Sequence, residues 1–200
     1  MNVYEAIESR RAVKIFDPAH KMTTSEKKKL FDLAQLTPTA FNIQHYRFVL
    51  VEDQSLRQKI REAAWNQAQV TDSSLLVILC ADAQAWQKEP VRYWSTASKE
   101  AQDFLLPAID TYYRGKERVQ LDEAQRSCGM VGMTLMLAAR AMGYDTSPMD
   151  GFDYGAVGKL INLPSDHVIS FMIAVGKKLK EPLPRPPLLP MADIIVHNQF

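Results

Sequence analysis

Polar and apolar positions along the chain first predict two short helices near the N-terminus. Asn2 with Glu5 and Thr23 with Glu26 are capping boxes, in which a side chain accepts from the backbone three residues on. The first helix is expected to end near the basic cluster Arg10–Lys14. The second must end before the proline that follows it, because the residue before a proline disfavours helical backbone angles.

Four segments have the apolar pattern or the position of extended chain. Leu75–Cys80 is a continuous apolar run, typical of a strand that is buried on both faces. Phe48–Val51 predicts a short strand and Val168–Val175 predicts the last strong one. Tyr144–Pro148 is expected to be extended as well.

Three further helices follow from caps and periodicity. Asp53 caps one helix, and Asp153 caps another that is expected to run to Leu163. Apolar residues at helical spacing predict a long buried helix over Leu121–Met142, with Gly143 as its C-terminal cap. Few strands among many helices indicate a layered α+β domain.

Two parts of the chain lack a clear pattern. Residues 84–120 are polar and rich in aromatic side chains, and we expect helix in places. Lys177–Pro190 contains five of the 11 prolines, which excludes an ordinary helix or a central strand. We therefore predict a single domain over residues 1–200, in which residues 177–200 form an arm toward a partner chain. The strand-like Ile194–Val196 is expected to close this arm.

Composition supports one globular domain. The 200 residues are 46% hydrophobic and 24% charged, which is enough apolar material for one core. The 24 Lys and Arg residues nearly balance the 23 Asp and Glu residues, leaving a formal net charge of +1. This balance excludes attraction to nucleic acid or to an anionic membrane as the dominant feature of the whole protein.

The cysteines and the termini favour a cytoplasmic protein. Cys80 and Cys128 form neither a CxxC pair nor a disulfide framework, which suits a reducing compartment. The N-terminus turns polar at once, so no signal peptide is expected, and no apolar run is long enough to span a membrane.

Metal and nucleotide motifs are missing from the sequence. No histidine has an i, i+4 partner or a nearby cysteine, so we expect surface or structural roles and no metal site for His20, His45, His167 and His197. The GxSxG, GxxxxGK[ST] and GxGxxG patterns do not occur.

Basic residues at both ends of the chain are candidates for anion binding. Arg10 and Lys14 would be one helical turn apart, so that both cations, with Arg11, could reach one phosphate. The alternative is a solvated basic helix end that the helix dipole stabilises. A second phosphate clamp and a solvated patch are likewise both open for Lys177, Lys178, Lys180 and Arg185.

Side-chain amides and one loop are the remaining candidates for ligand binding. Asn42 with Gln44, and Asn66 with Gln69, can donate and accept at a ring that carries alternating N–H and C=O groups. Ordinary turn chemistry is the alternative. Pro148–Asp153 is either a simple connection with an Asp cap or a segment that holds a backbone amide at the edge of a ligand.

Five motifs in this order resemble the FMN-dependent nitroreductase family. Arg10–Lys14 is similar to its RRSxR/K segment, and Pro38–Tyr46 to its PSSxNxQPW loop. Leu135–Tyr144 is similar to LxLAAxxxGL, Pro148–Asp153 to PxxGFD, and Val175–Gly176 to the VG that ends the last strand. The resemblance covers nearly the whole chain except residues 84–120.

The resemblance implies a fold, an assembly and an activity. The fold would be an α+β sandwich in which helices flank a central mixed sheet. The assembly would be an intertwined homodimer that binds FMN at its interface. The activity would be that of an oxidoreductase in which NADH or NADPH delivers electrons and leaves before nitroaromatics, quinones or related acceptors bind, a ping-pong scheme without an obligatory protein nucleophile.

The resemblance also implies which residues contact the cofactor. Arg10 would meet the FMN phosphate and Lys14 the N1/O2 side of the flavin ring, as a tuning rather than a catalytic group. The amide of Asp150 would point at N5. The loop that contains Asn42 would come from the partner chain, and Arg185 would lie near the phosphate. The complete set is Arg10, Arg11, Ala12, Lys14, Pro38, Thr39, Ala40, Asn42, Asn66, Gln69, Pro148, Met149, Asp150, Gly151 and Arg185.

This chain departs from the family pattern, and other functions stay open. Ala12 replaces a serine and Leu183 replaces a lysine, so the exact phosphate clamp is not defined. The same fold and cofactor would also serve dehalogenation, flavin degradation or enoate reduction. A flavin-binding carrier or redox sensor without turnover is a third possibility, and a purely structural protein leaves the ordered cations and amides unexplained. The choice between NADH and NADPH is open too.

Overall fold

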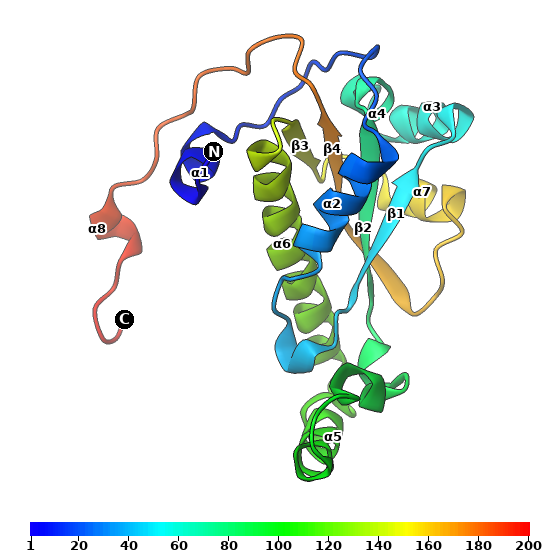
Figure 1. The fold of residues 1–200 in the computed structure, drawn as a ribbon, viewed down its shortest axis with the longest axis vertical. Helices are drawn as coiled ribbons and strands as arrows, with labels where there is room; N and C mark the ends of the chain where they lie inside the picture. Colours follow the sequence, from blue (N-terminus) through cyan, green and yellow to red (C-terminus); the bar gives the residue numbers. More distant parts are fainter.

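Four antiparallel strands form the centre of the protein, and the computed structural model describes all residues from 1 to 200 (Figure 1). The strands are β1 (Tyr46–Val51), β2 (Leu75–Asp82), β3 (Asp145–Met149) and β4 (His167–Gly176). Their order across the sheet is β1-β2-β4-β3, and every neighbouring pair is antiparallel. All eight residues of β2 are buried, which confirms the strand predicted from its apolar run.

The expectation of a mixed sheet is wrong for the four strands, and the one parallel contact lies outside them. Ala12, which lies outside the four strands, forms an isolated parallel bridge with Thr146 of β3. The strands themselves are all antiparallel, because each pair of strand neighbours runs in opposite directions. The bridge is important for the site, since it fastens the N-terminal basic segment to the edge of the sheet.

The helices largely begin where the caps predict. Both capping boxes are present, and the Asp53 and Asp153 side chains accept from the backbone amides of Leu56 and Ala156. Gly143 has a φ of +79°, which is the left-handed conformation expected of a helix cap. The helices are α1 (Val3–Ser9), α2 (Thr24–Ala34), η1 (Ala40–Asn42), α3 (Gln54–Ala63), α4 (Gln69–Asp72), η2 (Ala85–Gln87), η3 (Pro90–Trp94), α5 (Lys99–Tyr113), α6 (Glu117–Ala141), α7 (Tyr154–Leu160) and α8 (Met191–Ile194).

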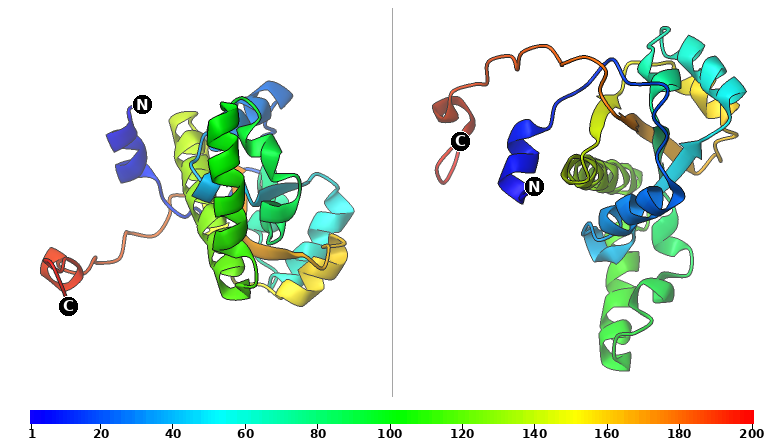
Figure 2. Two further views of the ribbon diagram at one scale, coloured as in Figure 1. Left: turned by 90° about the horizontal axis from the view of Figure 1, so that it is seen from below. Right: turned by 45° about the horizontal axis from the view of Figure 1, so that its top comes forward.

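Helices cover both faces of the sheet (Figures 1 and 2). Helices α2 and α6 pack on the face that presents Leu75, Val77 and Leu79 of β2. Helices α3, α4 and α7 cover the opposite face, where Leu76 and Ile78 point. The alternation along β2 therefore supplies two cores, one on each side of the sheet.

Residues 84–120 form an excursion beyond the end of the sheet (Figure 1). It contains η2, η3, α5 and the start of α6. A separate apolar cluster attaches it to the loop before β1, with Ile43, Trp86, Ile109 and Tyr113 buried at its centre. The expectation of helix in places is met.

The C-terminal arm leaves the body after β4 and is exposed along most of its length (Figure 1). The prediction of a strand over Ile194–Val196 is wrong: α8 occupies Met191–Ile194, and the residues after it are not in a strand. A strand needs a neighbour that pairs with its backbone, and this part of the arm lies away from the sheet. No helix in the structure combines the length and the apolar character that a membrane crossing requires.

Candidate functional site

The segment after α1 forms one wall of a basic pocket. The prediction that Arg10 and Lys14 are separated by a helical turn is wrong, because α1 ends at Ser9 and Arg10 is extended (φ −64°, ψ 127°). The Val13 amide donates to the carbonyl of Thr146 (2.9 Å), and this bond holds the segment straight along β3. Alternate residues of an extended chain share a side, so residues 10, 12 and 14 still line one pocket.

This pocket has a volume of about 300 Å³ and lies between the N-terminal segment and the C-terminal arm. Burial lowers the pKa of Arg10, and the guanidinium groups of Arg185 and Arg11 lower it further. The Arg10 Nε atom is buried without a hydrogen-bond partner. Such a crowded, partly desolvated group of cations favours an anion. The lining residues are Arg10, Arg11, Ala12, Lys14, Leu183, Pro184, Arg185 and Pro186.

The basic residues of the two chain ends have different contacts. Arg11 donates to the carbonyl of Leu183, and Arg185 donates to the carbonyls of Glu8 (3.2 Å) and Arg10 (3.1 Å). Lys14 is exposed and forms no ion pair. The other basic residues of the arm do not line the pocket: Lys177 lies over the ring of Tyr144, Lys178 pairs with Glu181, and Lys180 is exposed.

A second open pocket, of about 350 Å³, lies further along the same edge of the sheet. Strand β3 ends at Met149, which pairs with Met172 of β4. The residues of β4 that precede Met172 therefore have no neighbouring strand on this side. The pocket occupies that exposed edge, and Pro148, Met149, Asp150, Tyr154, Ser170 and Phe171 line it. Asp150 lies four residue steps after Thr146, which is beside the basic pocket, and this corresponds to roughly 13 Å of extended chain.

The loop between α3 and α4 is tied to this second pocket. Gln67 donates from Nε2 to the carbonyl of Gly151 (2.8 Å), and Gly151 lies directly against the ring of Trp65. Gln69 is buried and donates to Gln67, whereas Asn66 is exposed with a φ of +58°. The structure thus brings the predicted amide loop to the predicted Pro148–Gly151 segment through a residue, Gln67, that sequence reasoning missed.

The loop Pro38–Gln44 does not join these pockets within one chain. The loop leads into Tyr46, which pairs with Ala81 near the end of β2. The basic pocket lies at the opposite end of the sheet, where Thr146 pairs with Val175 and Val175 pairs with Leu75. Leu75 and Ala81 are six residue steps apart along β2, which is about 20 Å. Within the loop, Asn42 donates to the carbonyl of Tyr93 and the Gln44 amide donates to Asn42.

Several residues that line the site gave no signal in the sequence. Phe171 and Ser170 belong to an ordinary apolar strand, and Tyr154 to the first turn of a helix. Trp65 is 70% exposed and has a φ of +54°, two features that only the structure reveals. Its position beside Asn66 was the one available hint.

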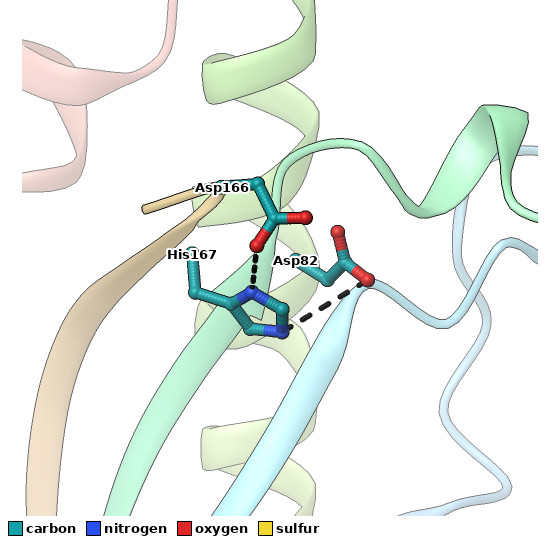
Figure 3. Close-up of side chains that lie close together, drawn as sticks. All are labelled: Asp82, Asp166 and His167. Carbon is teal, nitrogen blue, oxygen red and sulfur yellow. Dashed lines mark hydrogen bonds and ion pairs between the residues drawn. The ribbon is translucent and has the colours of Figure 1, made fainter. Parts of the chain in front are cut away.

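A cluster of charges joins the excursion to the end of the sheet, and three of its members, Asp82, Asp166 and His167, are drawn in Figure 3. His167 Nδ1 lies 2.6 Å from Asp166, and His167 Nε2 lies 3.9 Å from the buried Asp82. Lys88 bonds both carboxylates, at 2.8 Å to Asp82 and 2.6 Å to Asp166, and Arg47 lies 3.3 Å from Asp82. The spacing of Asp82, Asp166 and His167 would also suit a metal ion, but the ammonium of Lys88 already lies between the two carboxylates. We name this cluster the Lys88 clasp.

Comparisons with known proteins match almost the whole chain. The sequence profile described as Nitroreductase family matches residues 7–177. Protein DrgA of Synechocystis is 50% identical over 181 residues, which cover 90% of this chain and 86% of DrgA. MhqN of Bacillus subtilis, named as an NAD(P)H nitroreductase, is 32% identical and covers 88% of each chain. A CLA biosynthesis enone reductase of Lactiplantibacillus plantarum is also 32% identical, covering 88% of this chain and 85% of the relative.

Two solved structures are similar over nearly their full length. The structure of ydfN from Bacillus subtilis, named as a nitroreductase, has a TM-score of 0.89, 31% identity and 97% coverage of both chains. A chain from Exiguobacterium sibiricum, named as a nitroreductase and solved in complex with FMN, has a TM-score of 0.89 and 26% identity. That alignment covers 99% of this chain and 98% of the other.

Proposed function

This chain belongs to the nitroreductase family and is an oxidoreductase, and from that premise we propose that it binds FMN and uses NADH or NADPH to reduce small organic acceptors. Nitroaromatics and quinones are the acceptor classes proposed, in a ping-pong sequence. The FMN-bound neighbour supports the cofactor, and the name of MhqN supports the nicotinamide donor.

One observation carries the proposal: two unlike pockets lie along one strand. The basic pocket beside Thr146 suits a phosphate, and the pocket at Pro148–Asp150 is open and partly apolar. Extended chain of about 13 Å joins them. A molecule with an anionic end, a flexible linker and a flat heteroaromatic ring fits this arrangement, and FMN has that form.

The residues present fit such a molecule at both ends. The buried Nε of Arg10 has no partner within the protein, and leaving a buried charged donor unpaired is costly. Arg10 and Lys14 would hold the phosphate end and the neighbouring ring edge. Pro148–Gly151 would lie against one face of the ring, with the backbone amide of Asp150 at its edge. Asn66 and Gln69 would serve its polar edge through the loop that Gln67 fastens to Gly151.

When bound, FMN supplies two-electron redox chemistry between the nicotinamide donor and the acceptor. The protein's own contribution would be position and charge. Lys14, as a cation near the ring, would stabilise negative charge that develops there. Met149 and Phe171 would exclude water from one side of the ring, where the pocket is lined by apolar side chains.

A homodimer would complete this site. Pro38, Thr39, Ala40 and Asn42 precede Tyr46, which pairs with β2 about 20 Å along the sheet from the basic pocket of the same chain, so in this proposal they reach a flavin in a partner chain. An apolar groove of about 400 Å³ between α1, α2 and α6 is open to solvent and would favour association. Its apolar lining is Met1, Val3, Ala6, Leu33, Leu36, Leu137, Ala138 and Ala141.

Reduction of an enone is the second candidate reaction. The enone reductase of Lactiplantibacillus plantarum has the same percentage identity to this chain as MhqN, 32%. The same site would then present a carbon–carbon double bond conjugated to a carbonyl in place of a nitro group or a quinone. Steady-state rates with a quinone, a nitroaromatic and a conjugated enone, measured in parallel with one enzyme preparation, would rank the reactions.

The absorption spectrum of the purified protein under anaerobic conditions tests the cofactor and the donor together. We expect a flavin spectrum that bleaches when NADH or NADPH is added. A flavin spectrum that persists would favour a carrier, a sensor or a different reductant. A colourless protein that also fails to take up added FMN would refute the proposal.

A further inference from the structure

An open pocket of about 510 Å³ lies between η3 and the loop that precedes β1. It is at the other end of the sheet from the basic pocket, because Tyr46 at its edge pairs with Ala81, about 20 Å along β2 from Leu75. The volume is enough for a small aromatic molecule. Two arginines line the pocket and no carboxylate does. The lining residues are Gln44, Tyr46, Arg47, Arg92 and Tyr93.

The two arginines of this pocket have different electrostatic surroundings. Arg47 donates to two backbone carbonyls (2.9 Å each), and the buried carboxylate of Asp82, 3.3 Å away, offsets its charge. Arg92 is exposed and forms no ion pair. Its guanidinium donates to the hydroxyl of Tyr93 (2.8 Å) and lies 4.8 Å from the centre of that ring. Arg92 therefore presents an oriented positive charge that no carboxylate compensates.

Hydrogen bonds hold η3 against the loop that precedes β1. The side-chain amide of Asn42 donates to the carbonyl of Tyr93 (3.2 Å), and the indole of Trp94 donates to the carbonyl of Phe41 (3.1 Å). The position of η3, and with it that of Arg92, is therefore coupled to the position of this loop.

The loop itself has a strained backbone. Phe41, Asn42 and Gln44 have φ angles of +50°, +55° and +51°, in the left-handed region that residues other than glycine seldom adopt. Strained backbone of this kind concentrates at binding sites. In the proposed function the loop reaches the flavin of a partner chain, so the pocket beside it would lie next to the space in which substrates meet that flavin.

We propose that this pocket binds the anionic group of a substrate, with Arg92 as the residue that contacts the anion, while the flat ring of the substrate meets the flavin of the partner chain. This inference rests on the proposed function, which supplies the flavin and the dimer. A guanidinium group binds an oxyanion through two parallel hydrogen bonds, and a tyrosine ring offers apolar surface to an aromatic substrate. The anion has two possible sources: a carboxylate on an aromatic acceptor, or the 2′-phosphate that NADPH has and NADH lacks.

Two nitroaromatic acceptors that differ in charge test the pocket. The acceptors are 4-nitrobenzoate and the neutral 4-nitrobenzamide. Arg92→Met should lower kcat/KM for 4-nitrobenzoate by about 5- to 10-fold and change that for 4-nitrobenzamide by less than about twofold. Arg92→Lys, which keeps the charge, should restore most of the loss. Arg118→Met is the matched control, because it removes an exposed cation from the same excursion but outside the pocket.

The nicotinamide donor is the second arm of the same experiment. In a ping-pong sequence, kcat/KM for each substrate reports its own half-reaction, so NADPH and NADH can be compared separately from the acceptors. A loss in Arg92→Met confined to NADPH would assign the pocket to the 2′-phosphate, and a loss confined to 4-nitrobenzoate would assign it to the acceptor. A loss for both would show that the two anions use the pocket in turn. Unchanged values for both would overturn the proposal.

Equilibrium dialysis of the oxidised holoprotein measures binding without turnover. We expect the dissociation constant of 4-nitrobenzoate or of NADP⁺ to rise by about 5- to 10-fold in Arg92→Met, and binding to the unaltered protein to weaken with added salt. Equal binding of both anions by the two proteins would refute the pocket. Reduction of 4-nitrobenzamide tests the proposed function by itself: if it proceeds while Arg92 has no effect on either anion, only the pocket fails. If the unaltered protein holds no flavin and reduces neither acceptor, both proposals fail.

Discussion

The surroundings of His45 determine the protonation state of its side chain. It is fully buried between the excursion and the body, with Nδ1 3.2 Å from the Ser127 hydroxyl and its ring 5.8 Å from that of Tyr113. Its Nε2 has no partner. Burial lowers the pKa of His45 from 6.5 to about 4, so the imidazole is neutral at physiological pH.

This depressed pKa predicts a pH dependence of stability. The unfolded chain binds a proton on His45 near pH 6.5 and the folded chain does so only near pH 4, so the free energy of unfolding should fall as the pH falls through that window. We expect this group to cost about 2 kcal/mol between pH 7 and pH 5. Chemical denaturation of the unaltered protein and of His45→Gln at both pH values measures it. Equal pH dependence in the two proteins would contradict the assignment.

The position of Lys14 predicts a role for this residue in flavin reduction. It lines the basic pocket with an exposed, unpaired ammonium group, and it would stabilise negative charge on the flavin. Lys14→Met should slow anaerobic reduction of bound flavin by NAD(P)H by about tenfold or more in stopped-flow absorbance. Lys180→Met is the control, and an unchanged rate in Lys14→Met would remove this residue from the mechanism.

Among the elements, helix α6 lies against all four strands of the sheet. A Cβ atom added at Gly132 would overlap the end of the Phe171 ring and lie 3.1 Å from Leu79, so any side chain here would force Phe171 or the helix to shift. Phe171 also lines the pocket at Pro148–Asp150, and the helix contact therefore sets one wall of the site.

Gly132→Ala should destabilise the fold by about 1–3 kcal/mol, because Phe171 or the helix has to shift. Gly158→Ala makes the same change inside α7, where the nearest atoms would be 3.7 Å away. There the better helix propensity of alanine should leave stability equal or raise it by about 0.5–1 kcal/mol. Thermal unfolding of both variants tests the pair, and equal melting temperatures would refute the close-packing argument.

The Lys88 clasp attaches the excursion to the sheet through ion pairs. It joins the turn after η2 to the ends of β2 and β4, whereas the apolar attachment lies around Trp86 and Tyr113. Hydrogen bonds from Lys88 and His167 lower the pKa of Asp166 to about 2, so this carboxylate stays charged from mildly acidic pH upward.

Removal of the clasp should loosen the excursion. Lys88→Met leaves the buried Asp82 with weaker partners, and we expect a loss of about 1–2 kcal/mol with faster hydrogen exchange over residues 84–113. Lys99→Met in α5 removes an exposed pair with Asp103 and should change stability by less than about 0.5 kcal/mol. Exchange confined to other regions would show that the clasp does not attach the excursion.

The C-terminal arm is the feature of the whole molecule that contacts within one chain do not explain. Beyond Pro186 it carries Leu188, Leu189, Met191 and Ile194 into solvent, and the groove beside α6 is apolar and open as well. Exposed apolar surface of this kind favours a partner chain.

Deletion of the residues beyond Lys180 should therefore weaken both the dimer and the retention of FMN. The deletion removes the apolar end of the arm and also the Leu183–Pro186 wall of the basic pocket. Sedimentation velocity with detection at a flavin wavelength reports assembly and cofactor together. An intact, flavin-containing dimer after the deletion would refute a role for the arm in both.

The sequence by itself determined the features that depend on neighbours along the chain. The capping boxes of α1 and α2, the Asp53 and Asp153 caps and the Gly143 terminus were all predicted, because each is satisfied within a few residues. The buried strand β2 was predicted because its side chains are apolar on both faces. The ordered motifs also pointed to the family that the comparisons support.

Only the tertiary structure decided the features that depend on contacts between distant residues. Arg10 and Lys14 share a pocket through extended chain and not through a helix, because Val13 bonds Thr146 across the sheet edge. Ile194–Val196 is not a strand, because the arm carries it away from any strand that could pair with it. Gln67, Trp65 and Phe171 reach the site through turns and packing. Such contacts produce no periodic pattern in the sequence, because the contacting residues are far apart along the chain.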